Sequence, residues 1–172
     1  MLFYCGSCTT TPDWCTKRGN SKEENVLYIN QHCYVFRSSA EKWWDARFRC
    51  QSLKGWLAIF EEQSTINQIV EFIQEKDVDV HISLLQGTQG KTEPAGNWYW
   101  QTFCSQKLKD FNSSLWKEGE PDNADEGGEV GDDVDVAKLE RDSAAFVDIA
   151  DWGKAYPFFC EFKAHDCGFN DC

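Results

Sequence analysis

The sequence predicts one α+β domain that is cross-linked by disulfide bonds. Three observations lead to this fold class: helical periodicity is confined to the first half of the chain, short strand-like runs surround and follow it without βαβ alternation, and nine of the 172 residues are cysteines. We place the domain at 25–163, between a cysteine-bearing N-terminal arm at 1–24 and a cysteine-bearing C-terminal tail at 164–172.

Short runs rich in β-branched and aromatic residues predict the strands. Two adjacent strands are expected at 26–29 and 32–36. Further strands are expected at 80–85, 98–100, 134–139, 144–149 and 156–162. In the run at 98–100 we expect one of Trp98 and Trp100 to face the core and the other to line the neighbouring loop.

The first helix is expected at about 39–52. The Ser-Ser-Ala-Glu pattern at 38–41 is typical of a capping box. Trp43, Ala46 and Cys50 follow at spacings of three and four, which indicates one buried helical face.

A second helix is expected from Ser64 to about 76–77, with a short buried strand at 56–60 before it. Its apolar residues recur at the spacing of one helical face and are Ile66, Ile69, Val70 and Ile73.

The segment at 101–135 shows no periodicity, and such a long irregular segment is usually either functional or disordered. Its second part, 118–135, holds nine carboxylates and no cation, in a chain of net charge −12. Because this charge repels phosphate backbones, we expect no nucleic acid partner and favour cations or basic proteins.

The cysteine content indicates an oxidising compartment, so we expect a secreted or extracellular protein; the ectodomain of a membrane protein would look the same. Zinc binding is the alternative, although only Cys5 and Cys8 have the paired spacing of a zinc site. The glycosylation motif at 112–114, Asn-Ser-Ser, fits the same compartment. No apolar run reaches the roughly 18 residues of a membrane span.

A series of motifs between Leu27 and Phe162 resembles the C-type lectin-like domain in content and order. The motifs are Cys33-Tyr34-x-Phe36, Trp43-x-x-Ala46-x3-Cys50, Leu57-Ala58-Ile59, Ile66-x-x-Ile69, His81-Ile82-Ser83-Leu84, Trp98-x-Trp100, Trp116-x-x-Gly119-Glu120-Pro121-Asp122-Asn123 and Tyr156-Pro157-Phe158-Phe159-Cys160-Glu161. The resemblance implies a fold with two helices, small antiparallel sheets and a long irregular loop that holds the ligand site.

The resemblance also implies disulfide pairings. Cys50 is expected to bond to Cys160, and Cys15 is the nearest candidate partner for Cys33. The positions of a second family disulfide hold Val136 and Trp152 instead. We therefore expect that bond to be absent and its volume to be filled by packing.

Since nine cysteines cannot all pair within one chain, one is left over. We assign it to Cys104, at the start of the irregular segment. There it either joins a second chain in a disulfide-linked dimer or remains a free thiol.

In sugar-binding members of the family, a calcium ion in the long loop is held by acids and amides around a cis proline. By position, the resemblance implies a ligand site formed by Trp116, Glu120, Asp122, Asn123 and Asp148. The calcium ligands would be Glu120, Asp122 and Asp148, with Asp133 or its neighbour Asp135 as a fourth.

Calcium affinity is expected to be weak, because Ile149 stands where the family has a second acid. An Ile149→Asp substitution should then strengthen binding.

The resemblance implies a binding module, and we expect no enzyme activity. A protein ligand bound without a strict need for calcium is favoured, and the alternative is a calcium-dependent carbohydrate-binding lectin. The acidic loop can also be interpreted as a solvated surface with no ligand.

Overall fold

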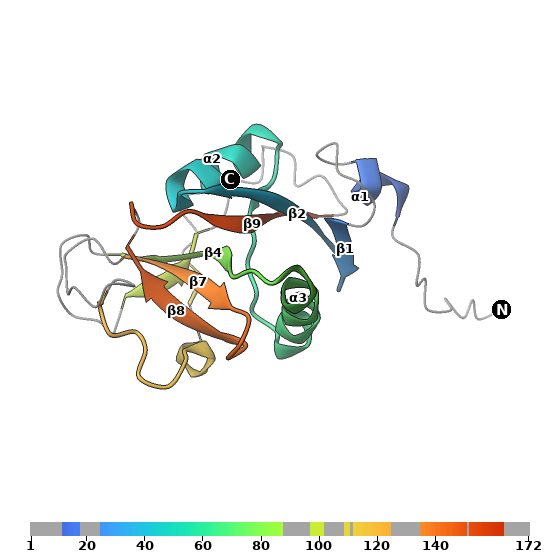
Figure 1. The fold of residues 1–172 in the computed structure, drawn as a ribbon. Helices are drawn as coiled ribbons and strands as arrows, with labels where there is room; N and C mark the ends of the chain where they lie inside the picture. Colours follow the sequence, from blue (N-terminus) through green and yellow to red (C-terminus); the bar gives the residue numbers. More distant parts are fainter. Residues whose placement is uncertain are drawn as a thin grey trace.

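The structure is a computed structural model that describes residues 12–17, 25–87, 97–101, 109–110, 112–124, 135–150 and 152–163 (Figure 1). The helices are α1 (Asp13–Lys17), α2 (Trp43–Ser52), α3 (Gln63–Lys76) and the 3-10 turn η3 (Ser113–Leu115). The strands are β1 (Val26–Ile29), β2 (His32–Glu41), β3 (Trp56–Leu57), β4 (Val80–Gln86), β5 (Trp98–Trp100), β6 (Lys109–Asp110), β7 (Val136–Glu140), β8 (Ala145–Ile149) and β9 (Tyr156–Lys163). This is the α+β class that the sequence predicts.

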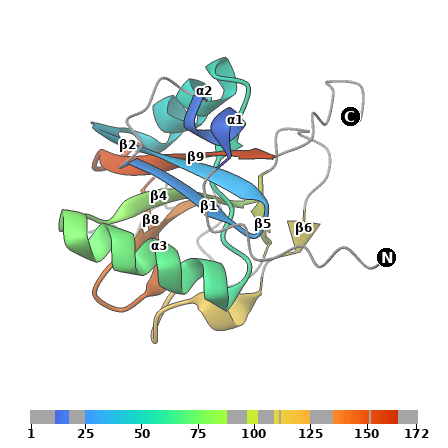
Figure 2. The same ribbon diagram turned by 90° about the vertical axis from the view of Figure 1, so that its right-hand side faces the viewer.

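The strands form one mixed sheet in the order β1-β2-β9-β4-β5-β6, with β3 on β9 and the β7–β8 hairpin on β4. The last strand pairs antiparallel with the second, placing Val35 opposite Cys160. Figures 1 and 2 show the two long helices on opposite sides of this sheet. Sequence-distant strands are thereby joined at the centre of the domain.

Strand β9 contributes to two hydrophobic cores, one under each helix. Phe158, Cys160 and Phe162 pack in the core beneath α2. Phe159, which points to the other face, packs in the core beneath α3. This division follows from the strand period of two, which sends successive side chains to opposite faces of a sheet.

Helix α3 follows its predicted bounds closely. The residues that form its buried face are Thr65, Ile66, Ile69, Val70 and Ile73. The helix ends at Asp77, whose left-handed backbone lets its N–H reach the carbonyl oxygen of Gln74 at 3.2 Å.

Helix α2 begins at Trp43, so the capping box expected at 38–41 is wrong. Those residues form the end of β2, and Glu41 lies opposite Tyr156 of β9. The N-cap is Lys42, whose side chain makes no capping hydrogen bond. Pairing with a strand more than a hundred residues away overrides the local helix signal. The buried face of Trp43, Ala46 and Cys50 is as predicted.

Trp98 and Trp100 are both buried, so the expected division between core and loop is wrong. They lie two residues apart on β5 and therefore share one face of the sheet. Trp98 contacts Trp116, and Trp100 contacts Phe146. Three other short elements, α1, β6 and η3, lie in segments where the sequence shows no periodicity.

The structure contains the disulfides Cys15–Cys33 and Cys50–Cys160, the two pairings expected from the resemblance. The first attaches α1 to β2. The expectation that Trp152 fills the place of a missing disulfide is wrong, because its side chain is 59% exposed. Cys104 lies outside the described residues, as do most of the predicted arm and all of the tail beyond 163, so the domain boundaries and the dimer remain predictions.

A buried polar group lies where β4, β7 and β9 meet. His81 on β4 is directly opposite Lys138 on β7, and both are largely shielded from solvent. The Lys138 ammonium donates to Asp79 at 3.1 Å and to the Tyr156 hydroxyl at 3.2 Å. The ring of His81 meets that of Tyr156 edge-on at 5.1 Å between centroids. This group replaces hydrocarbon packing with hydrogen bonds and charge at one end of the sheet.

Candidate functional site

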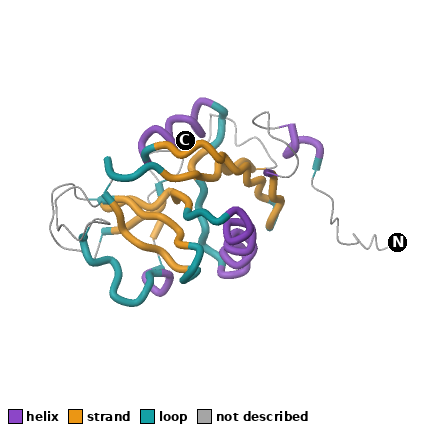
Figure 3. Tube along the Cα trace, in the orientation of Figure 1, coloured by secondary structure: helices purple, strands orange, loops and turns teal. Residues whose placement is uncertain are grey.

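The candidate site is built on the loop at 116–124, drawn as loop after the short turn η3 in Figure 3. The loop is tied to β8 by the backbone bond from Lys117 N–H to the Phe146 carbonyl, 2.9 Å. The Trp116 ring meets Trp98 edge-on at 4.9 Å. These two contacts fix the start of the loop against the α3-side core.

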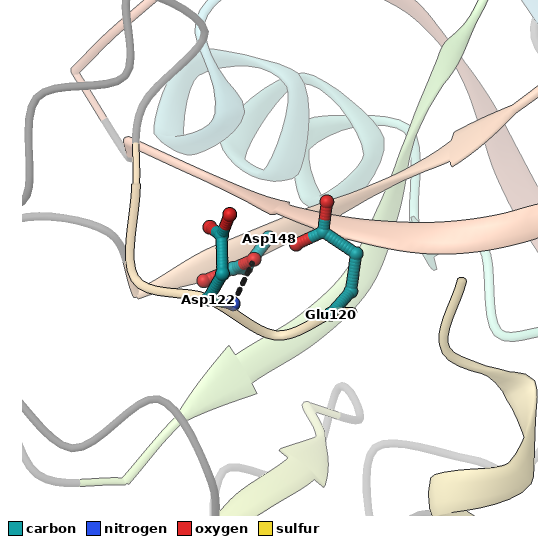
Figure 4. A group of neighbouring side chains, drawn as sticks. All are labelled: Glu120, Asp122 and Asp148. Atoms are coloured by element: carbon teal, nitrogen blue, oxygen red, sulfur yellow. Dashed lines mark hydrogen bonds between the residues drawn. The ribbon is translucent and has the colours of Figure 1, made fainter. Parts of the chain in front are cut away.

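The centre of the loop is a turn around Pro121. The Glu120 N–H donates to the Lys117 carbonyl at 2.9 Å, and the Glu120–Pro121 peptide bond is cis. Gly119, with φ of 93°, lies in the region that side-chain-bearing residues rarely adopt. Figure 4 shows Glu120 and Asp122 of this turn on either side of Asp148 of β8.

Asp148 holds the other end of the loop from β8. One of its carboxylate oxygens accepts from the Asp122 N–H at 3.2 Å, and the other accepts from the Asn123 N–H at 2.8 Å. Asp148 is 1% exposed, so these bonds lie away from bulk water. A buried carboxylate with two backbone donors orients the loop as well as adding charge to it.

The three carboxylates converge. Glu120, Asp122 and Asp148 each offer an oxygen within 4.8 Å of the others. One oxygen of Glu120 is buried and has no hydrogen-bond partner among the described residues. An oxygen of Asp122 accepts from the Ala124 N–H at 2.8 Å, which fixes that side chain at the exposed edge. Hydrogen bonds therefore hold the cluster in place, but one buried carboxylate oxygen lacks a hydrogen-bond partner among the described residues.

This crowding changes the acidity of the cluster. Burial, the hydrogen bond to Asp148 and repulsion from Asp148 and Asp122 raise the pKa of Glu120 to about 8. Burial also raises the pKa of Asp148, against the opposing effect of its hydrogen bonds. Each of these two acids therefore binds its proton more tightly than a free carboxyl group does. A cation placed between them would relieve the same repulsion.

The donor set fits a hard cation but only in part. Calcium takes six to eight oxygen ligands, and the described residues offer three converging carboxylates. Asp135 is not part of this cluster; it is buried beside β4, where its backbone carbonyl accepts from the Gln86 N–H at 2.7 Å. Asp133 lies outside the described residues. Water or further ligands would have to complete the coordination of an ion.

Ile149 points away from the cluster. Its side chain is 3% exposed and belongs to the α2-side core, whereas Asp148 faces the loop. The expectation that Ile149→Asp would strengthen calcium binding does not fit this geometry. A carboxylate there would enter the core instead of the site, at a large desolvation cost.

Trp116 and Asn123, which were also expected to contact the ligand, are partly or fully buried in the loop. Trp116 is half-buried against Trp98, and Asn123 is 1% exposed, with a left-handed backbone at φ of 58°. Lys117 and Glu140 form an ion pair of 2.9 Å beside the cluster, which the sequence did not predict. Its charges are 23 residues apart in sequence, so no local pattern indicates it.

The raised pKa of Glu120 predicts an unusual pH dependence of stability without metal. Because the folded chain binds this proton more tightly than the unfolded chain, the contribution is fully present below about pH 4.5 and is lost as pH rises toward about 8. In Glu120→Gln, the neutral amide keeps a donor toward Asp148, so this loss should disappear. Melting temperatures in chelator at pH 5, 7 and 9 test this: a wild-type-minus-variant difference that does not fall with pH contradicts it.

Comparison with known proteins identifies the fold. The carbohydrate-recognition domain of cow CD23, crystallised in the presence of a GlcNAc2Man3 oligosaccharide, is 22% identical, with 85% of this chain and 98% of that chain covered and a TM-score of 0.60. The human scavenger receptor C-type lectin domain is 21% identical, with coverages of 83% and 99% and a TM-score of 0.64. Herring type II antifreeze protein is 12% identical, with coverages of 82% and 98% and a TM-score of 0.62. No family model and no curated protein sequence matches the chain.

The chain therefore has the C-type lectin-like fold, as the resemblance implied. In this fold the cluster joins the loop at 116–124, which carries Glu120 and Asp122, to Asp148 on β8.

Proposed function

We propose that this protein is an extracellular recognition module that binds calcium weakly at Glu120, Asp122 and Asp148 and uses the bound ion to hold a ligand. The observation that carries the proposal is the convergence of these three carboxylates within 4.8 Å. Like charges this close repel one another unless a proton or a cation lies between them. At extracellular calcium concentrations an ion can take that place.

The ligand class that suits such a site is a glycan. An ion that is only partly coordinated by protein oxygens leaves positions for sugar hydroxyls, and the exposed Asp122 can accept hydrogen bonds beside it. The sequence favours a protein ligand instead. The convergence of three carboxylates supports the glycan alternative, because it gathers oxygen ligands for one cation.

The extracellular location is supported by two disulfides whose four sulfur-bearing residues are fully buried. Such bonds form and persist in oxidising compartments. Among the helices of the described ranges, none is long and apolar enough to cross a bilayer.

Calcium-independent recognition of a protein is the second candidate. It is favoured by the small number of converging carboxylates, which is three. Ile149, at the position where the family has a further acid, packs in the α2-side core and adds no ligand. The net charge of −12 points to a basic partner.

Calorimetry and melting curves with and without calcium test the ion site. With a dissociation constant of about 10⁻⁴ to 10⁻³ M, about 10 mM calcium should stabilise the chain by about 1 to 3 kcal/mol. Glu120→Gln and Asp148→Asn should each lose this response. Glu118→Gln is the matched control, since it removes an exposed carboxylate of the same loop outside the cluster.

A glycan array in calcium and in chelator then tests the ligand. Binding of one sugar class that chelator abolishes supports the glycan proposal. If calcium neither binds nor stabilises the wild-type chain, the ion site is wrong and the protein-binding candidate takes its place.

A further inference from the structure

We propose that Asn112 carries an N-linked glycan. Asn112 is the N-cap of η3, which directly precedes the loop with Glu120 and Asp122. The inference rests on the extracellular location proposed above and on the structure around residues 112–114. Asn112 would be a modification site separate from the carboxylate cluster. The attached group is an oligosaccharide, linked through N-acetylglucosamine.

The local chemistry meets the requirements of the modification. The segment reads Asn112-Ser113-Ser114, followed by leucine, so no proline blocks the motif. All three residues of the motif are exposed. This separates it from the many such triplets that chance places inside a folded core.

The side chain of the exposed Asn112 is held by a hydrogen bond to its amide oxygen. Its Oδ1 accepts from the Ser114 N–H at 3.1 Å and caps the turn η3, with backbone φ of −82° and ψ of 106°. A glycan on Nδ2 would not disturb this bond, because the bond uses only the oxygen. The folded structure can therefore keep both the cap and the sugar.

Backbone hydrogen bonds hold the glycosylation motif in place on the domain. Leu115 N–H donates to the Asn112 carbonyl at 3.2 Å, and the next residues are tied to β8 and Trp98. Only seven residues lie between Asn112 and Glu120. A glycan here would stand at the start of η3, directly before the loop that carries the candidate site.

The modification transfers an oligosaccharide to the amide nitrogen of Asn112. The donor is a lipid-pyrophosphate-linked oligosaccharide of the secretory pathway. A bond forms between Asn112 Nδ2 and C1 of the terminal N-acetylglucosamine, the bond from C1 to the pyrophosphate oxygen breaks, and the amide nitrogen loses one proton. The serine hydroxyl of Ser114 is the second recognition element.

The test is secretion from eukaryotic cells behind a cleavable leader, followed by peptide mass analysis. Wild-type protein should carry hexosamine-based mass on the peptide containing Asn112, and peptide N-glycosidase should remove it and convert Asn112 to aspartate. Ser114→Ala should abolish the modification while keeping the backbone donor of the cap. Ser113→Ala is the matched control, which changes the neighbouring exposed serine and should stay modified.

The outcomes separate the two proposals. A secreted chain that contains the Cys50–Cys160 bond but has unmodified Asn112 overturns the glycosylation site and leaves the location intact. Mass that persists on this peptide in Ser114→Ala also overturns it. A chain that is retained and lacks the disulfide overturns the extracellular location from which the proposal starts.

Discussion

Replacing Cys50 and Cys160 together by alanine should lower the free energy of unfolding by about 5 kcal/mol. The bond closes a loop of 110 residues, and chain-entropy estimates for a loop of that length give about this value. For a domain of this size, the melting temperature should fall by about 10 to 20 °C. Urea unfolding at pH 7 in chelator measures the effect.

The matched control is the pair Cys15→Ala and Cys33→Ala. These cysteines are also fully buried, so truncation costs are similar, but their sequence separation is only 18. The same estimate gives about 3 kcal/mol. Equal losses in the two double variants would show that loop closure does not govern the stability of this fold.

Acidification should destabilise the chain through His81. This imidazole is 1% exposed; its Nε2 donates to the Glu41 carbonyl at 2.9 Å, and its Nδ1 is buried with no partner among the described residues. Burial, assisted by the charge of Lys138, lowers the pKa of His81 to about 4. A proton added at Nδ1 would meet a second cation across the β4–β7 pair.

The sign of the effect follows from the lowered pKa. The stabilising contribution is present above the unfolded value of about 6.5 and is lost as pH falls toward 4. The loss should reach about 3 kcal/mol of unfolding free energy. His81→Gln keeps a donor toward Glu41 but does not titrate, so the difference between wild type and variant should shrink across this window. Parallel pH curves for the two proteins would contradict this account.

The comparison with Glu120 makes the experiment more specific. Glu120 stabilises the metal-free chain toward acid, whereas His81 destabilises it. The two windows overlap between pH 4.5 and 6.5, so wild type alone cannot separate them. Each single variant removes one of the two contributions.

The sequence predicted the elements that depend on residues near one another in the chain, and it failed where partners lie far apart in the chain. The α3 face from Ile66 to Ile73 is a local pattern, and its helix was predicted to within about a residue. The start of α2 was missed because Glu41 is recruited into β2 by Tyr156, a partner that no window of neighbouring residues contains. The burial of both Trp98 and Trp100 would have followed from the strand period alone.

The candidate site shows the same limit. The positions of Glu120, Asp122 and Asp148 came from motif resemblance, since the 25 residues between Asp122 and Asp148 carry no signal that joins them. The direction of Ile149 and the exposure of Trp152 were not predictable from alignment, because each depends on where β8 ends and β9 begins. The raised pKa values of Glu120 and Asp148 depend on distances that only the folded chain defines.

The place of β9 in both cores has a consequence for biosynthesis. The ribosome releases β1, β2, α2 and α3 long before it releases 156–163, yet neither helix can finish packing without Phe158, Phe159 and Phe162. The nascent chain must keep its apolar helix faces exposed until this last strand emerges. The Cys50–Cys160 bond can therefore form only after β9 has emerged, because Cys160 lies on that strand.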